Sequence, residues 1–383
     1  MLSELRKSFP LQTAALESPA EPRSPASRFR LKVWIIFTSF GFEEISPMKT
    51  RIVFVLTLAC IALAGMAAFS ASLETGAPLR NFEFTYLARI PVLPADAKIS
   101  RIWIPLPQSG QYQTIGNLKI ETPFAYTKLR DAEYGNEYVY LQVPAAKITA
   151  PSEVRVSFEV TRHEDRVLLE AHPVTVQSGL SSPDIQRFLQ PDRRVPLDGV
   201  IAELSAQETH GLQDPLAKAR AIYNYVIATM RYDKSGSGWG NGDAIWACTA
   251  KRGNCTDFHS LFIGMMRAAG IPARFEIGFP LPSDQHDGAV AGYHCWAEFY
   301  VEPYGWIPVD ASEAWKHPDK KDYFFGALDD NRLQFTVGRD IRLNPPQQGD
   351  PLNYFVYPYA EVDGKPFGVE SKFSFQDRAI VNH

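Results

Sequence analysis

The segment Gly253-Asn254-Cys255-Thr256-Asp257-Phe258 constrains this chain more than any other, because it places a cysteine where a helix is expected to begin. Apolar residues recur at helical spacing after it, and Gly270 with Pro272 marks the end of the helix. At a helix N-terminus, unpaired backbone N–H groups and the helix dipole favour a thiolate. Cys255 is therefore a candidate nucleophile. The alternative is a buried structural cysteine.

Two strand-like runs downstream supply a histidine and an aspartate. Residues 292–301 are rich in aromatic and β-branched residues and contain His294. Residues 303–305, Pro-Tyr-Gly, indicate a turn, and residues 306–310 form a second strand-like run that ends at Asp310. A hairpin built in this way puts Asp310 beside His294. The carboxylate would hold the imidazole in one orientation, and the imidazole would accept the thiol proton.

Side chains alternate along a strand, so neighbours point to opposite faces. If His294 faces Cys255, Trp296 shares its face and Cys295 points away. Cys295 is then free either to form a disulfide with Cys248 or to remain a buried thiol, and both alternatives stay open.

Four segments in this order resemble the transglutaminase-like superfamily, whose members are related to the papain-type thiol enzymes. They are Gly253 to Phe258, Arg267 to Ala273, His294 to Glu298 and Gly305 to Asp310. The resemblance spans roughly residues 200–345, less than half of the chain. It implies an α+β fold, in which a nucleophile helix packs on an antiparallel sheet.

The resemblance also implies roles for three residues: Cys255 as nucleophile, His294 as base and Asp310 as the orienting acid. The implied chemistry is acyl transfer or hydrolysis at a peptide or carboxamide carbonyl through a thioester. Such an enzyme is a peptidase or amidase, or else a protein-glutamine acyltransferase, and its partner is a peptide or protein. No metal or organic cofactor is required. The alternative function is a catalytically silent module that binds peptide or cell-envelope partners.

Two further hypotheses concern the surroundings of Cys255. In related transglutaminases a tryptophan upstream of the nucleophile stabilises the oxyanion. Here Trp239 and Trp246 are candidates, with packing as the alternative role, and the backbone N–H of Cys255 is the preferred oxyanion donor. A metal site is the second hypothesis. Paired Cys-x-x-Cys spacing is absent, which argues against such a site, and we interpret His259 as a hydrogen-bonded helix residue. The metal site would draw on Cys248, Cys255, His259, His294 and Cys295.

The remaining sequence predicts a second domain and little affinity for nucleic acid. With 383 residues the chain can hold two domains, and its formal net charge of −4 accompanies no basic stripe. Residues 77–175 show alternating strands with Pro- and Gly-bearing connections, which is typical of a β-sandwich-like domain. Residues 200–345 form the expected catalytic core, and residues 346–383 form a C-terminal β extension.

The N-terminal region resembles an export signal. A basic start at Met48, an apolar middle and small residues near Ala71 indicate a signal peptide over residues 48–71, or an uncleaved signal anchor. Residues 1–47 precede this start and are interpreted as a non-native or disordered leader. The expected location is secreted or periplasmic, and the protein would contact a membrane only if the signal stays uncleaved.

Overall fold

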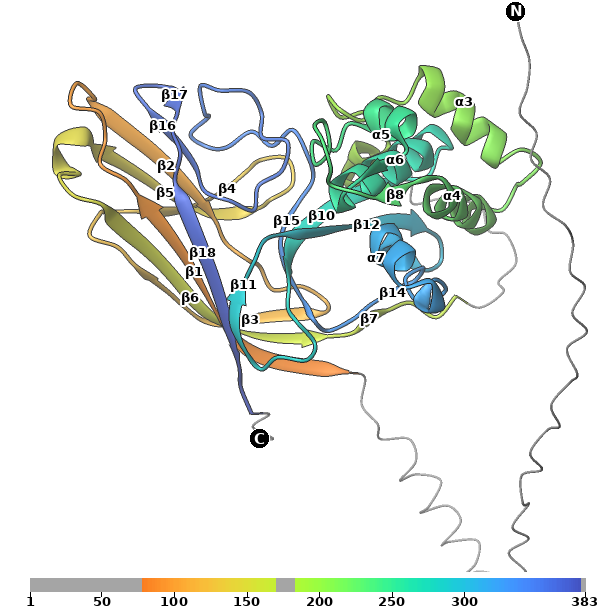
Figure 1. Cartoon of the computed structure of the whole chain (residues 1–383), viewed down its shortest axis with the longest axis horizontal. Coiled ribbons are helices and arrows are strands. Elements are labelled where there is room, and N and C mark those ends of the chain that lie inside the picture. Colours follow the sequence, from red (N-terminus) through yellow and green to blue (C-terminus); the bar gives the residue numbers. More distant parts are fainter. Residues whose placement is uncertain (1–77, 170–182, 380–383) are drawn as a thin grey trace, which may run out of the picture. The chain divides into compact units, whose positions relative to one another are not determined.

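The structure is a computed structural model that describes residues 78–169 and 183–379 (Figure 1). The leader expected at residues 1–47 and the signal segment expected at 48–71 lie outside the described residues. Within the described ranges, no helix combines the length and apolar character needed to cross a membrane. The described residues all belong to one compact unit.

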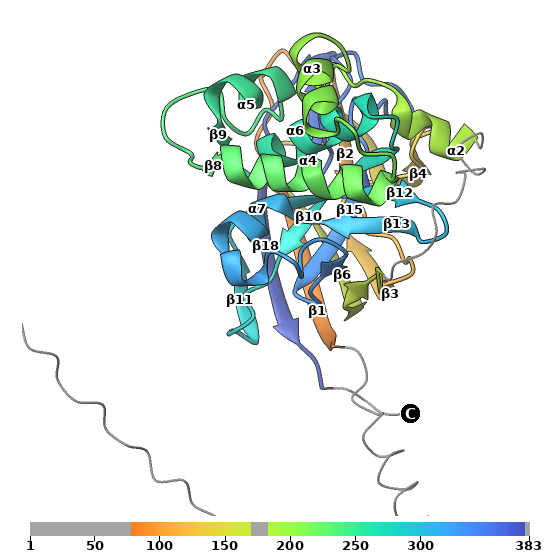
Figure 2. The same cartoon turned by 90° about the vertical axis from the view of Figure 1, so that its right-hand side faces the viewer.

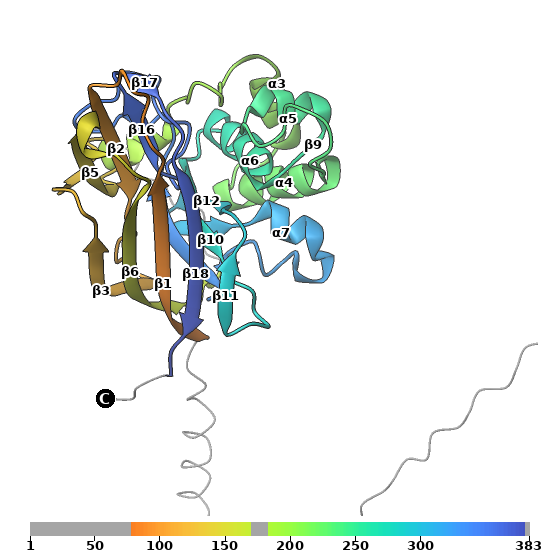
Figure 3. The same ribbon diagram turned by 60° about the vertical axis from the view of Figure 1, so that its left-hand side comes forward.

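Two five-stranded antiparallel sheets build the β part of this unit. The first has the order β11-β18-β1-β6-β3, and Figure 3 shows β18 between β1 and β11. Its strands are β1 (Leu79–Ile90), β3 (Gln113–Glu121), β6 (Ser152–His163), β11 (Asp287–Val290) and β18 (Glu370–Asp377). Alternate residues of β1 are buried, as its sequence pattern predicts, and the core-facing ones include Phe82, Phe84 and Tyr86.

The second sheet has the order β17-β16-β2-β5-β4. Its strands are β2 (Ile99–Pro105), β4 (Thr127–Arg130), β5 (Glu137–Pro144), β16 (Tyr359–Val362) and β17 (Lys365–Pro366), and the short helix η1 (Ala145–Lys147) follows β5. Apolar side chains of both sheets belong to one hydrophobic cluster. The C-terminal segment is therefore integral to this part, because β16 pairs with β2 and β18 pairs with β1.

The other part of the unit is a four-stranded antiparallel sheet with the order β13-β12-β10-β15. Helices α3 to α6 gather on one face of it (Figures 1 and 2). The strands are β10 (Ala273–Pro280), β12 (His294–Val301), β13 (Gly305–Val309) and β15 (Arg332–Val337). The helices are α3 (Gly199–Glu208), α4 (Pro215–Thr229), α5 (Ala244–Ala250), α6 (Cys255–Ala268) and α7 (Ala311–Lys316).

Short elements connect these layers. They are β7 (Asp165–Arg166) paired with β14 (Ala327–Leu328), β8 (Arg231–Tyr232) paired with β9 (Arg252–Gly253), α2 (Pro183–Gln186), η3 (Arg187–Leu189) and η4 (Pro318–Lys320).

Aromatic contacts join the four-stranded sheet to its neighbours on both sides. On the helical side, Phe262 of α6 meets Phe299 of β12 with ring centroids 6.2 Å apart. On the other side, Phe279 of β10 lies 5.4 Å from Phe84 of the first β-sheet. The predicted α+β class, with a helix that begins at Cys255 and packs on an antiparallel sheet, is confirmed.

Candidate active site

Helix α6 begins at Cys255, as the sequence predicts, because its cap residues satisfy the first turn. The side chain of Asn254 accepts a hydrogen bond from the Thr256 N–H (2.9 Å), and Asp257 Oδ2 accepts one from the Asn254 N–H (2.9 Å). This is a reciprocal capping box. Gly253 precedes it with φ +150°, and a Cβ there would lie 2.3 Å from the Asp257 carboxylate. Only glycine fits this approach to the helix.

Asp257 also holds the loop that leads to the nucleophile. Its fully buried carboxylate accepts hydrogen bonds from the backbone N–H groups of Gly240 (2.7 Å) and Gly242 (3.0 Å), besides that of Asn254. Three backbone donors therefore converge on one side chain. We interpret Asp257 as a support for the site and assign it no chemical role.

The hairpin of β12 and β13 brings His294 and Asp310 together. His294 is the first residue of β12, Asp310 directly follows β13, and Ala297 pairs with Val309 in the register between them. His294 Nε2 lies 2.6 Å from Asp310 Oδ2, and both side chains are buried. Nε2 therefore donates to the carboxylate, which leaves Nδ1 for the side-chain hydrogen bond between His294 and Cys255.

The electrostatics of this trio favour an ion pair. Burial disfavours the charged imidazolium, but the charge and hydrogen bond of Asp310 outweigh it and raise the pKa of His294 to about 9. Burial also opposes ionisation of the Cys255 thiol. Hydrogen bonds from Cys295 and His294 and the charge of His294 reverse that effect and hold the pKa of Cys255 well below its usual value. Both shifts favour the thiolate–imidazolium form of the pair, which is the reactive form of a thiol nucleophile.

The Asp310 carboxylate has further donors besides His294. Arg332 Nη1 lies 2.7 Å from Oδ2, while Oδ1 accepts hydrogen bonds from the Ser312 hydroxyl (2.9 Å) and the Glu313 N–H (2.9 Å). Burial raises the pKa of Asp310, but the charges of His294 and Arg332 hold it well below its usual range. Arg332 was missed by the sequence reasoning, because no motif marks an arginine that lies on a different strand.

His259 links α6 to the residues after β13 through two hydrogen bonds. Its Nε2 accepts a hydrogen bond from the Ala311 N–H (3.1 Å), so Nδ1 carries the proton and donates to the Cys255 carbonyl (2.8 Å). Burial lowers the pKa of His259, which agrees with this neutral tautomer. The interpretation of His259 as a hydrogen-bonded helix residue is confirmed. Both ring nitrogens are occupied, and among the residues described here no cluster of three His, Cys, Asp or Glu is arranged to hold a metal.

The expectation that Cys295 points away from the nucleophile is wrong. Its Sγ lies 3.7 Å from Thr256 Oγ1 and 3.8 Å from His259 Nδ1, and it forms a side-chain hydrogen bond with Cys255. The physical reason is that α6 covers the face of β12 opposite Trp296, so Cys295 meets the first turn of that helix. The disulfide alternative is not formed either, since Cys248, Cys255 and Cys295 are all free thiols.

Two features define how a substrate could bind next to Cys255, His294 and Asp310. A cavity of ≈280 Å³ opens beside His294 and is also lined by Glu313, Lys320, Phe324 and Arg332. Cys255 is the first helical residue, and its backbone N–H has no acceptor within the helix because the carbonyl four residues earlier lies outside it. This N–H is therefore placed to serve as an oxyanion donor.

The two candidate tryptophans contact residues that lie close to them in the sequence, Trp239 in the loop before α5 and Trp246 within α5. Trp239 Nε1 donates to the Gly236 carbonyl (3.1 Å), and the Arg252 guanidinium lies 5.7 Å from the centre of the Trp246 ring. These contacts favour the packing role for both residues.

Comparisons with known proteins agree with this fold. Residues 202–311 match the family model of the transglutaminase-like superfamily, so the chain carries a transglutaminase-like core and the resemblance found in the sequence is confirmed. A Haemophilus influenzae protein described as uncharacterized is 29% identical over 354 residues, which cover 83% of this chain and 95% of that protein.

Solved structures include two bacterial neighbours. A candidate cysteine protease from Cytophaga hutchinsonii has a TM-score of 0.59 at 17% identity and covers 80% of this chain and 93% of its own. The periplasmic domain of TgpA from Pseudomonas aeruginosa has a TM-score of 0.34 at 16% identity, with coverage of 65% and 92%, and supports no argument about this fold. The papain/transglutaminase-like fold class predicted from the sequence is confirmed.

Proposed function

We propose that this protein is a thiol enzyme that performs acyl transfer or hydrolysis at peptide or carboxamide carbonyls. The observation that carries the proposal is the buried chain of contacts in which Asp310 binds His294 at 2.6 Å and His294 binds Cys255 at the start of α6. A structural cysteine does not need an imidazole held in a fixed orientation by a buried carboxylate.

The proposed reaction has two stages. The Cys255 thiolate attacks the carbonyl carbon, a C–S bond forms, and the Cys255 N–H stabilises the oxyanion. The His294 imidazolium gives a proton to the departing nitrogen, the C–N bond breaks, and ammonia or an amine leaves a thioester behind. His294 then accepts a proton from water or from a second amine, which attacks the thioester and releases the thiolate. Asp310 holds the imidazole throughout.

Whether water or an amine completes the reaction defines two versions of this activity. With water the enzyme is a peptidase or amidase, and with an amine it is a protein-glutamine acyltransferase. The description of the Cytophaga neighbour as a candidate cysteine protease agrees with the first version. In both versions the substrate is a peptide or protein.

Mass spectrometry of the products tests the activity. The purified protein is offered peptide amides with and without a primary amine, and Cys255→Ala is the matched control. A mass gain of about 1 Da on a carboxamide, or two fragments that add a water, identifies hydrolysis; a peptide–amine conjugate identifies exchange. Products that are equal for the wild type and Cys255→Ala would defeat the proposal and favour the silent binding module.

We also propose that the protein is exported, on the basis of the signal-like sequence that starts at Met48. Mass spectrometry of the native N-terminus tests this proposal. A mature chain that begins near residue 71, found outside the cytoplasm, supports it. Peptides from residues 1–47 in the native protein would contradict it.

A further inference from the structure

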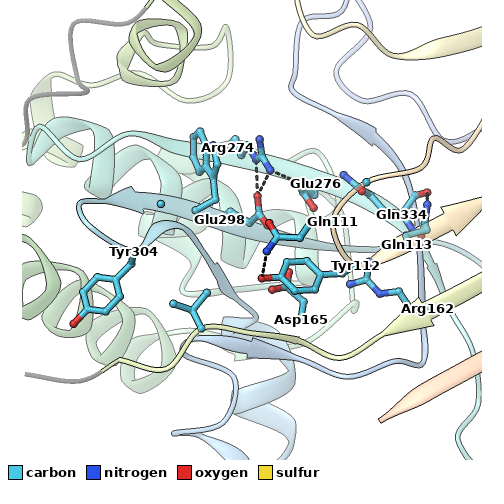
Figure 4. Close-up of a pocket in the computed structure, with 14 residues that line it drawn as sticks. Gln111, Tyr112, Gln113, Arg162, Asp165, Arg274, Glu276, Glu298, Tyr304 and Gln334 are labelled. Atoms are coloured by element: carbon cyan, nitrogen blue, oxygen red, sulfur yellow. Dashed lines mark hydrogen bonds and ion pairs between the residues drawn. The ribbon is translucent and has the colours of Figure 1, made fainter. Parts of the chain in front are cut away.

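A second cavity lies away from Cys255 and has a different character. It measures ≈350 Å³ and opens between the four-stranded sheet and the segment that runs from β6 into β7 (Figure 4). Glu298 of β12 lines it and shares a strand face with His294 four residues earlier, which corresponds to about 13 Å along the strand. Trp296 lies between them and is only 1% exposed. The cavity is therefore separate from the proposed acyl site.

Opposite charges line this cavity in unequal number. Three carboxylates, those of Asp165, Glu276 and Glu298, face two guanidinium groups, those of Arg162 and Arg274. We call it the carboxylate cavity. Arg274 serves two carboxylates at once: its Nε donates to Glu298 Oε2 at 2.6 Å, and its Nη2 lies 3.1 Å from Glu276 Oε1. One carboxylate is thus left in excess of the available cations.

Two carboxylate oxygens that line the cavity have no hydrogen bond among the described residues. Asp165 Oδ1 and Glu276 Oε1 have no hydrogen-bond partner among the described residues, and these side chains are 3% and 4% exposed. The 3.1 Å approach of Arg274 to Glu276 Oε1 does not satisfy this oxygen as a hydrogen bond. A buried carboxylate oxygen without a donor is unfavourable by roughly 1–3 kcal/mol or more. Such an oxygen needs either a proton or a ligand that donates hydrogen bonds.

The surrounding polar groups are already used elsewhere. Gln113 Nε2 donates to the carbonyls of Gln108 and Gln334, both at 3.0 Å, and its Oε1 accepts from the Gln334 N–H. Trp296 Nε1 donates to Glu276 Oε2 at 2.9 Å, which is the other oxygen of that carboxylate. Arg162 Nε is also buried without an acceptor, but the three carboxylates outnumber the two guanidinium groups. The lining as a whole therefore offers acceptors and negative charge to an occupant.

We propose that the carboxylate cavity binds a small organic cation with a guanidinium or primary ammonium head. Such a head brings the missing positive charge and several N–H donors, which match the two oxygens of Asp165 and Glu276 that have no hydrogen bond. Trp306 and Tyr304 supply aromatic surface for an aliphatic stem. The volume of ≈350 Å³ lies at the small end of the range for ligand pockets.

Binding of a cation here is linked to pH. Burial raises the pKa of Asp165 to about 7, and burial together with the charge of Glu298 raises the pKa of Glu276 to about 8. A bound cation favours the ionised carboxylates, so it releases protons and its affinity increases from pH 6 to pH 8.5. Two neighbouring groups also act on the cavity. Tyr112 donates a hydrogen bond to Asp165, and the charge of Arg332 lowers the pKa of Arg162. Neither effect reverses the expected increase of affinity with pH.

Calorimetry with a matched pair of probes tests the proposal. Butylguanidinium and the neutral isostere butylurea are titrated into the purified protein at pH 6.0 and pH 8.5, in two buffers of different ionisation enthalpy. Butylguanidinium is expected to bind at least tenfold more tightly at pH 8.5 than at pH 6.0 and to release protons, whereas butylurea does not bind measurably. Butylammonium is titrated in the same way, to test whether a primary ammonium head also binds. Equal binding of butylguanidinium and butylurea, or no binding of either cation at millimolar concentration, overturns the proposal.

Variants locate the binding. Glu276→Gln keeps an oxygen for the Trp296 N–H but removes the charge, and Asp165→Asn is its counterpart on β7. Each variant is expected to bind butylguanidinium at least tenfold more weakly than the wild type. Glu153→Gln, an exposed residue of β6, is the charge-matched control and leaves the affinity unchanged. Thermal melting verifies that each variant is folded. Wild-type affinity in a folded Glu276→Gln protein refutes the assignment, and because the assay measures no turnover, its outcome is independent of the proposed enzymatic activity.

Discussion

Arg332 Nη1 donates to the same carboxylate oxygen of Asp310 that accepts the hydrogen bond from His294, at 2.7 Å and 2.6 Å respectively. The orienting carboxylate is thus held from two strands, β12 and β15, and is fully buried. Arg332 also reaches Asp329 through Nη2 at 3.3 Å. Arg332 is thus a fourth member of the site, and its charge helps to keep Asp310 ionised by lowering the pKa of that carboxyl.

We expect Arg332→Lys to lower kcat by roughly tenfold with little change in KM, because one ammonium cannot reproduce the fork that meets Asp310 and Asp329. Steady-state kinetics on the substrate found in the product screen measures this. Arg220→Lys, which changes an exposed pair with Asp322, is the control and leaves kcat unchanged. Unaltered kcat in a folded Arg332→Lys protein would show that Arg332 does not position the carboxylate.

Asp310→Asn and Asp310→Ala are expected to differ in their free energy of unfolding. Removal of the Asp310 side chain leaves the buried Arg332 without its nearer carboxylate partner, so Asp310→Ala lowers the free energy of unfolding by roughly 3–5 kcal/mol. Asp310→Asn keeps an oxygen and should remain folded with reduced but measurable activity, since mainly orientation and charge are lost. Urea denaturation together with kcat/KM separates the two effects. Equal stability of both variants would contradict the buried pair.

The pH profile of kcat/KM should have an alkaline limb near pH 9. The pKa of His294 is raised, so the imidazolium is present below about pH 9 and is lost above it. Because Asp310 is the main cause of that rise, Asp310→Asn should move the alkaline limb to lower pH. Initial rates from pH 5 to pH 10 test this. If the alkaline limb stays at the same pH in Asp310→Asn, it reports the titration of a group other than His294.

His259→Ala should lower the free energy of unfolding by roughly 2–5 kcal/mol, because the Cys255 carbonyl and the Ala311 N–H both lose a buried partner. Chemical denaturation measures the loss. His317→Ala, at an exposed position, is the matched control and should stay within about 0.5 kcal/mol of the wild type. If the two variants are equally stable, His259 does not join α6 to the residues after β13.

Much of the site could be predicted because its signals are local. Helical periodicity, the cap at Asn254 and the stop at Gly270 define α6 without reference to other parts of the chain. The hairpin that joins His294 to Asp310 depends only on two neighbouring strands and the turn between them. Local sequence patterns report such features directly.

The remaining features depend on contacts between distant segments. The sequence pattern of β12 gives alternation but not the face that α6 covers, so the direction of Cys295 relative to Cys255 was predicted wrongly. Arg332 approaches Asp310 only because β15 pairs with β10. The C-terminal strand β18 has a clear strand pattern, yet nothing local identifies β1, nearly 300 residues earlier, as its partner.

Alkylation of Cys255 as a function of pH tests the central claim most directly. Iodoacetamide labelling, followed by mass spectrometry of the peptides with Cys248, Cys255 and Cys295, gives a separate rate for each thiol. We predict that Cys255 reacts fastest, that its rate is already substantial near pH 6, and that His294→Ala returns its pH dependence towards an ordinary thiol. Slow labelling of all three thiols, with Cys255 unreactive below about pH 8 and insensitive to His294→Ala, would contradict the thiolate–imidazolium pair.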